Sequence, residues 1–143
     1  MTPRRIAIAA SIAILLGSSL LVAAPASAST GDCPLYRACV WKDTNYETAG
    51  SGTNSKSFSQ YLDDYTGYSW SSGQGGINDN VTSVYNHGAI ESTRWFRDVG
   101  GLGGYFTLAP SAGDGNLANT GGSGGVGHND WVSSSYFSSY YPR

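Results

Sequence analysis

The chain has 143 residues, with 20 glycines, 10 tyrosines and 4 tryptophans, and 13% of its residues are charged. This glycine-rich and aromatic composition disfavours helices and favours an all-β fold. The formal net charge of −2 argues against nucleic acid as a partner, because phosphate binding needs a basic surface.

The N-terminal segment has the three parts of a secretory signal peptide. Arg4 and Arg5 precede a long apolar run, which ends in an Ala-Ser-Ala exit. The run is close to membrane-spanning length, so a retained anchor is the alternative. No basic residues follow the exit directly, and this favours cleavage. We therefore predict a signal peptide at residues 1–28 and one domain at 29–143, which is secreted, extracellular, monomeric and free of the membrane.

Two cysteines, Cys33 and Cys39, lie close together near the start of the predicted domain. In an exported chain such a pair predicts a disulfide bond. The alternative is a metal or redox site, but the spacing is not Cys-x-x-Cys and no nearby histidine completes a zinc set. The disulfide would fasten an N-terminal segment that would otherwise fray.

In chain order, six short segments predict β-strands. They cover residues 38–42, 57–62, 81–85, 93–97, 105–108 and 132–137. Turn-forming Gly, Asn, Asp and Ser separate them, which is typical of a sandwich or barrel. Residues 61–65 could instead form one helical turn, and the glycine stretches 73–76 and 113–127 are expected to be loops.

An internal repeat runs through the predicted domain. Asn-Asp-Asn-Val-Thr-Ser at 78–83 recurs as Asn-Asp-Trp-Val-Ser-Ser at 129–134, and Trp-Lys-Asp at 41–43 has a looser echo in Phe-Arg-Asp at 96–98. A repeat of roughly 50 residues implies a duplicated four-stranded motif. Neither copy could enclose a core alone, so we expect the two to pack as one sandwich.

The duplication predicts two Greek-key motifs, at residues 33–84 and 91–137. The expected core residues are Trp41, Val81, Val84, Trp95, Phe106, Val132 and Phe137.

The paired segments resemble the βγ-crystallin superfamily, whose metal motif reads (Asn/Asp)-(Asn/Asp)-x-x-(Ser/Thr)-Ser. Residues 78–83 and 129–134 match it at each specified position. Within that superfamily the layout is similar to the secreted bacterial metalloproteinase inhibitors. These begin with Cys-Pro-x4-Cys before an aromatic strand, as residues 33–41 do here. The resemblance extends over residues 33–137 and implies a βγ-crystallin-like sandwich.

The chain departs from the family pattern at three places. In the hairpin pattern aromatic-x4-aromatic-x-Gly, Thr48 stands where the first copy should have glycine. In the second copy, Gly101 stands where the second aromatic residue belongs. The best-known inhibitors also carry a second disulfide that stiffens the reactive loop, whereas this chain has one cysteine pair.

The paired motifs suggest a calcium site. Calcium takes six to eight oxygens from carboxylates, amides, hydroxyls and carbonyls. The alternative is purely structural, because Asp and Ser side chains also cap turns. In the family, each site combines oxygens of one motif with a carbonyl of the other. The resemblance thus implies the ligand set Asn78, Asp79, Asn80 and Thr82 with Asn129, Asp130, Trp131 and Ser133.

No pattern in the sequence predicts an enzyme. Gly121–Gly125 matches Gly-x-Ser-x-Gly and residues 122–127 match Gly-x-Gly-x-x-Gly, but neither lies between a strand and a helix. His87 and His128 are interpreted as loop histidines, and the pair Asp63-Asp64 as a turn or solvated surface.

The resemblance implies a peptidase inhibitor whose partner is a secreted metallopeptidase. The alternative is a calcium-binding βγ-crystallin-type stress, structural or cell-surface module. Two segments are candidates for the inhibitory loop, residues 69–76 and 109–127. We favour the first, because Trp70 could anchor in an apolar peptidase pocket.

Overall fold

The computed structural model describes residues 29–47, 54–70, 72–119 and 127–142, and the predicted signal peptide lies outside them. Its elements are eight strands and three short 3-10 helices. The strands are β1 Ala38–Trp41, β2 Ser55–Phe58, β3 Tyr61–Leu62, β4 Ser83–Asn86, β5 Thr93–Asp98, β6 Leu102–Leu108, β7 Gly113–Asp114 and β8 Ser134–Phe137. The 3-10 helices are η1 Thr30–Asp32, η2 Thr44–Tyr46 and η3 Ser138–Tyr140.

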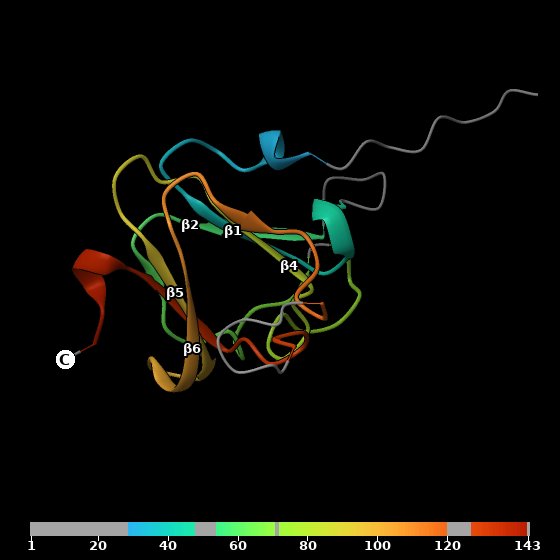
Figure 1. Ribbon diagram of the computed structural model, residues 1–143. Helices are drawn as coiled ribbons and strands as arrows, with labels where there is room; N and C mark the ends of the chain where they lie inside the picture. Colours follow the sequence, from blue (N-terminus) through green and yellow to red (C-terminus); the bar gives the residue numbers. More distant parts are fainter. Residues whose placement is uncertain (1–28, 48–53, 71, 120–126, 143) are drawn as a thin grey trace, which may run out of the picture.

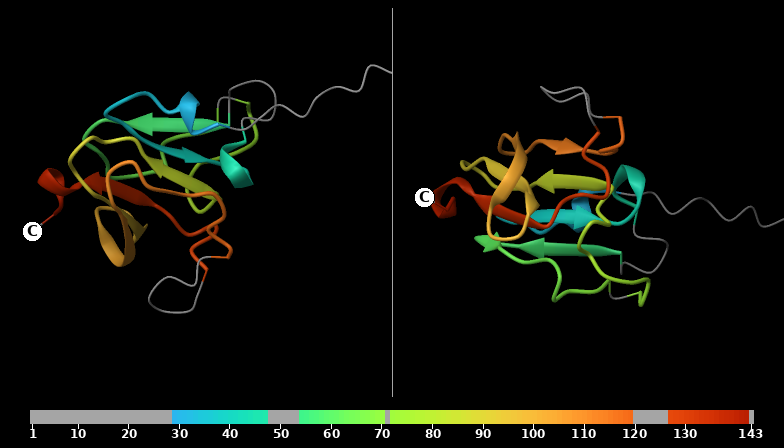
Figure 2. Two further views of the ribbon diagram at one scale, coloured as in Figure 1. Left: turned by 45° about the horizontal axis from the view of Figure 1, so that its top comes forward. Right: turned by 90° about the horizontal axis from the view of Figure 1, so that it is seen from below.

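The strands form two four-stranded antiparallel sheets that pack face to face (Figure 1). One sheet has the order β2-β1-β4-β7, and its four strands lie side by side in the right view of Figure 2. The other sheet has the order β3-β8-β5-β6. The predicted all-β sandwich is confirmed.

Each half of the chain gives one strand to the other half's sheet. The repeat makes β1, β2 and β4 of the first half equivalent to β5, β6 and β8 of the second. β3 then leaves the first half to pair with β8, and β7 leaves the second half to pair with β4. This exchange is the Greek-key arrangement expected from the duplication.

The space between the sheets is filled by apolar side chains that alternate inward along the strands. The buried members are Ala38, Val40, Phe58, Leu62, Tyr65, Trp70, Ile77, Val81, Val84, Trp95, Leu117, Val132 and Phe137. Phe106 is partly buried and packs against this core. Trp41, also predicted as core, is buried on the opposite side of β1, under Cys33 and Cys39. Val40 faces inward, so the next side chain must face outward.

The structure corrects three expectations about single elements. The strand predicted at 57–62 is two strands, because the chain bends after Phe58 and passes from one sheet to the other. Tyr61–Leu62 is a strand rather than part of a helical turn. The glycine-rich stretch after Ala112 begins with β7, whose pairing partner β4 lies far away in the sequence.

Within the described residues, no helix has the length and apolarity needed to cross a membrane.

Candidate functional site

The two Asn-Asp motifs form a pair of matching turns that lead into β4 and β8. Asp79 and Asp130 both adopt left-handed backbone conformations, with φ of 51° and 56°. The Asp79 N–H donates to the Val132 carbonyl at 3.3 Å, and the Asp130 N–H donates to the Val81 carbonyl at 3.2 Å. Through these reciprocal bonds each turn contacts the other in the same way, which corresponds to a local pseudo-twofold relation.

Within each turn the side chains also make matching hydrogen bonds. Asn78 Nδ2 donates to the Asp79 carboxylate, and Asn129 Nδ2 donates to the Asp130 carboxylate. Asn80 Nδ2 and Trp131 Nε1 each donate to the backbone carbonyl four residues earlier, at 3.1 Å. Asn80 and Trp131 thus brace their turns through equivalent side-chain N–H groups.

Oxygen atoms in both turns are of the kind that a hard cation binds. Asn78 Oδ1 and Asn129 Oδ1 are buried, and the described residues offer neither a hydrogen-bond partner. Ser133 Oγ donates to Asp79 Oδ1 at 3.1 Å, so a hydroxyl of one motif meets the carboxylate of the other. Burial, and then the nearby Asp79 carboxylate, raise the pKa of Asp130. A divalent cation would relieve both effects, because it binds buried oxygens and offsets like charges.

Calcium fits this set better than a transition metal. The described residues hold no group of three or more His, Cys, Asp or Glu side chains placed to share a metal ion. The set is two carboxylates with amide, hydroxyl and carbonyl oxygens, which are the ligands that calcium accepts. The Thr82 backbone fixes the position of the first motif. Its N–H donates to the Trp41 carbonyl, and its carbonyl accepts from the Leu117 N–H.

The last serine of each motif has a structural role. Ser83 Oγ donates to the Asp43 carbonyl at 2.7 Å and accepts from the Tyr46 N–H at 3.1 Å. Its equivalent Ser134 donates to the Asp98 carbonyl at 2.7 Å and accepts from the Gly101 N–H at 3.0 Å. Each serine therefore fastens the hairpin of its own motif against the sheet.

The predicted disulfide joins Cys33 and Cys39, whose Cα atoms are 5.9 Å apart. Both cysteines are buried against Trp41, whereas Leu35 and Tyr36 at the loop tip are 66% and 69% exposed. The bond therefore closes a short loop that presents two large apolar side chains to solvent.

Trp70, predicted as an exposed anchor, is 2% exposed and belongs to the core between the sheets. Its side chain cannot enter a peptidase pocket without leaving that core, so the predicted role is wrong. The loop around it is a tight turn, in which Ser69 bridges Gly76 and the Trp70 N–H binds the Gly75 carbonyl at 3.0 Å. An alternating apolar pattern around Trp70 would have predicted its burial. The sequence has none, because serines and glycines surround Trp70.

The remaining candidate residues, His87, His128 and Asp64, make contacts within the fold. His87 Nδ1 donates to the Cys33 carbonyl at 2.7 Å, and His128 stacks on Phe106 with ring centres 4.6 Å apart. Asp64 accepts from the N–H and hydroxyl of Thr66, which lower its pKa. The Gly-x-Ser-x-Gly segment and residues 120–126 of the second predicted loop lie outside the described residues.

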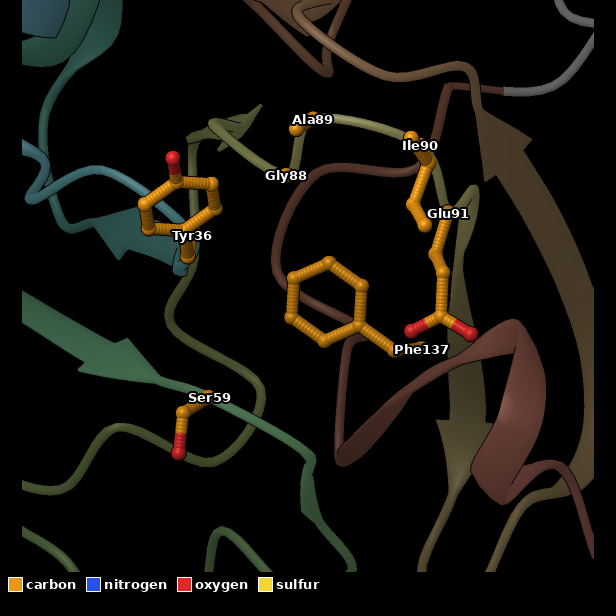
Figure 3. A pocket seen from close by; sticks show the side chains of 7 residues that line it. All are labelled: Tyr36, Ser59, Gly88, Ala89, Ile90, Glu91 and Phe137. Carbon is orange, nitrogen blue, oxygen red and sulfur yellow. The ribbon is translucent and has the colours of Figure 1, made fainter.

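Sequence reasoning missed a hollow beside the disulfide loop. Its volume is about 270 Å³, and it is lined by Tyr36, Ser59, Gly88, Ala89, Ile90, Glu91 and Phe137 (Figure 3). Ile90 is 87% exposed at its edge. The signal available in the sequence was an isoleucine in an otherwise small and polar connection, Asn-His-Gly-Ala-Ile-Glu-Ser.

Comparison with known proteins gives both a family and a fold. The model of peptidase inhibitor family I36 matches residues 26–108. Similar solved structures include one described under the evolution of the eye-lens βγ-crystallin domain fold, with 21% identity and a TM-score of 0.58, covering 74% of this chain and 89% of that one. A search of curated proteins gave no match.

Two further structures share the fold. A βγ-crystallin from Ciona intestinalis has 19% identity and a TM-score of 0.52, covering 71% of this chain and 98% of that one. Spherulin 3a from Physarum polycephalum has 22% identity and a TM-score of 0.50, covering 73% and 84%. At these identities the likeness concerns the fold.

Proposed function

The chain belongs to peptidase inhibitor family I36, and from this membership we propose that it is a secreted, monomeric inhibitor of an extracellular metallopeptidase. The family match is the observation that carries the proposal. It names a peptidase as the protein partner and an inhibitor, not an enzyme, as the class of molecule. The choice of a metallopeptidase follows the resemblance of the Cys-Pro-x4-Cys opening and the paired Asn-Asp motifs to metalloproteinase inhibitors.

The fold suits inhibition by tight occupation of a cleft. Its loops connect strands of a packed sandwich, and the first loop is closed by the Cys33–Cys39 disulfide. A pre-organised loop loses little conformational entropy on binding, so more of its contact energy appears as affinity.

The test is an inhibition panel with purified residues 29–143. A thermolysin-like zinc endopeptidase, subtilisin and papain represent the metallo, serine and cysteine classes. We expect inhibition of the zinc enzyme with a dissociation constant in the nanomolar range, as for other peptidase–inhibitor pairs of high affinity. Absence of inhibition across metallopeptidases at micromolar concentration would contradict the proposal, and inhibition of subtilisin or papain alone would contradict the metallopeptidase class.

We also propose that the paired turns bind calcium, with Asp79 and Asp130 as the charged ligands. The observation in favour is the pair of buried, unpartnered amide oxygens beside two facing carboxylates. With only two carboxylates the affinity should be weak, on the order of 10⁻⁵ to 10⁻³ M. At a calcium concentration about 100 times the dissociation constant, binding at one site would stabilise the fold by about 2.7 kcal/mol.

Asp130→Asn separates calcium binding from folding. Asparagine tolerates the left-handed backbone at this position, and it removes the charge that faces Asp79. In a chelator we expect the variant to be at least as stable as the wild type, because partial desolvation and the neighbouring Asp79 carboxylate disfavour the charge on Asp130. In millimolar calcium only the wild type should gain thermal stability. An equal calcium-induced shift in both proteins would show that the ion binds elsewhere.

A further inference from the structure

We propose that the surface offered to the peptidase is an apolar rim made of Leu35, Tyr36, Ala89 and Ile90. The rim joins the disulfide-closed loop to the connection between the two motifs. This inference rests on the proposed function and names the part of the molecule that performs it.

The rim combines strong exposure with apolar character. Leu35, Tyr36 and Ile90 are 66%, 69% and 87% exposed, and among the described large apolar residues only Leu102 reaches a similar value. Tyr36 and Ile90 stand on two sides of the hollow, and Phe137 lies between them (Figure 3). Large apolar side chains held in water in this way are the anchors that fill pockets in a partner protein.

The first loop of the rim, closed by Cys33 and Cys39, is fixed to the sandwich by covalent and hydrogen bonds. The disulfide closes it, and His87 ties it to β4 through three hydrogen bonds. The Tyr36 N–H donates to the His87 carbonyl at 3.0 Å, the His87 N–H donates to the Arg37 carbonyl at 2.8 Å, and His87 Nδ1 donates to the Cys33 carbonyl at 2.7 Å. Tyr36 itself has a left-handed backbone, with φ of 63°, which turns the tip outward.

The second loop is wound around one buried side chain. Asn86 Oδ1 accepts from the Gly88 N–H at 2.9 Å, and Asn86 Nδ2 donates to the Glu91 carbonyl at 2.8 Å. A Cβ atom at Gly88 would lie 2.7 Å from the Phe137 ring, so glycine lets this loop close against the core. Both loops are therefore fixed before binding, as an inhibitor requires.

A peptidase cleft suits the rim better than a second copy of the chain. The family names a peptidase as the partner, and peptidase clefts take up single side chains in separate pockets. A peptidase–inhibitor interface buries about 1,200–2,000 Å² in total, so the rim would supply its central anchors and the neighbouring surface would supply the rest. The alternative loop at 69–76 lacks an apolar anchor, because Trp70 is in the core.

The chain offers a matched control on the β5–β6 hairpin. Leu102 is 65% exposed, nearly the same as Leu35, and Tyr105 is 51% exposed, which is less than Tyr36 but still above half. They lie toward the end of the hairpin where Asp98 pairs with Leu102, whereas the rim adjoins Phe137, which pairs with Thr93 at the other end of β5. The double variants L35A/Y36A and L102A/Y105A thus remove the same side chains from different surfaces.

The experiment measures the inhibition constant of both double variants, and of I90D, against the peptidase that the wild type inhibits best. We expect L35A/Y36A to weaken inhibition by at least about 30-fold and I90D by about 10-fold, as for loss of interface anchors. L102A/Y105A should stay within about 3-fold. Thermal unfolding and intact mass establish that each variant is folded and keeps its disulfide.

The outcomes separate the two proposals. If the wild type inhibits no peptidase, the proposed function fails and the rim fails with it. If the wild type inhibits and the folded L35A/Y36A variant inhibits equally, the proposed function stands and the rim is overturned. Sedimentation that shows a wild-type dimer, dissociated by L35A/Y36A with unchanged inhibition, would likewise overturn the rim as the peptidase surface.

Discussion

The two Greek-key motifs solve the same packing problem with different residues. In the first motif, Trp41 packs edge-on against Tyr46, with ring centres 5.2 Å apart. In the second, Phe96 takes the place of Trp41, but Gly101 takes the place of Tyr46. A Cβ atom at Gly101 would lie 2.3 Å from Pro142 Cγ, so the C-terminal segment occupies the space that the missing aromatic ring would fill.

The comparison shows which part of the hairpin both copies require. Ser83 and Ser134 are completely buried and make equivalent hydrogen bonds to the hairpins of their motifs. The backbone contact made by the serine is thus retained, while the apolar volume beside it can come from elsewhere in the chain. The coverings of the outer faces differ in the same way, with a disulfide over the first and aromatic rings of Tyr61, Tyr105 and Tyr136 over the second.

The largest expected effect comes from removing the first aromatic residue of each motif. Trp41→Ala should lower the free energy of unfolding by about 5 kcal/mol, and Phe96→Ala by about 3 kcal/mol. The difference follows because Trp41 is completely buried, whereas Phe96 retains a little exposure. Denaturant unfolding followed by circular dichroism measures both. A larger loss for Phe96→Ala than for Trp41→Ala would contradict this order.

Replacing Ser83 or Ser134 should lower the free energy of unfolding by less than the aromatic replacements do, and by equal amounts. Ser83→Ala and Ser134→Ala each leave a buried N–H and a carbonyl without their partner, which corresponds to about 1–3 kcal/mol. Ser57→Ala, at a half-buried strand position, is the control and should change stability by less than about 0.5 kcal/mol. Clearly unequal losses at the two serines would show that the hairpins are not equivalent.

Gly101→Ala tests the use of the C-terminal segment in place of an aromatic ring. Its φ of 72° and the close approach of Pro142 should together cost about 1–2 kcal/mol. Gly100→Ala is a matched control, because it has nearly the same φ but open space around its Cβ. The difference between the two variants in lost unfolding free energy gives the steric cost at Gly101. Removing residues 142–143 should remove most of that difference, because the added Cβ then contacts only the Tyr136 ring, at 3.2 Å. An unchanged difference would rule out Pro142 as the cause.

The smallest expected effect concerns the position before each Asn-Asp turn, which is buried Ile77 in the first motif and His128 in the second. Burial lowers the pKa of His128 below its ordinary value of 6.5, while Asp114 opposes this shift. The unfolded chain therefore takes up the proton first, and stability should fall as the pH drops through about 6.5. After allowance for solvent screening, the loss should stay below about 1 kcal/mol.

His128→Ile makes the second motif like the first and removes this proton. Unfolding free energies of both proteins between pH 8 and pH 5 give the comparison. The wild type should lose stability relative to the variant over this range. A constant difference between the two curves would show that His128 has the same pKa in the folded and unfolded states.

Residues with local roles were predictable from the sequence. The repeated Asn-Asp segments predict turns, because these residues tolerate the left-handed backbone found at Asp79 and Asp130. The single pair of cysteines could bond only with each other. The strands predicted at 38–42, 93–97 and 132–137 overlap β1, β5 and β8.

Features that depend on distant partners were not predictable. The two-residue strand at Gly113–Asp114 exists because β4 offers an edge, and its own composition indicates a loop. The burial of Trp70 depends on how its turn folds back over the core, which no local pattern reveals. The exposed rim likewise arises only when Tyr36 and residues 89–90 line one hollow, although they lie more than 50 positions apart along the chain.

The exchange of strands between the halves also determines when the molecule can fold. β3 at Tyr61–Leu62 pairs only with β8, which ends at Phe137, so the first half keeps an unpaired segment until almost the whole chain is present. Pairings of this sequence separation slow folding, because much of the chain must be ordered before the contact forms. The first half therefore cannot mature while the second is still being synthesised, and the sandwich should assemble late, in one cooperative step, when the last strand arrives.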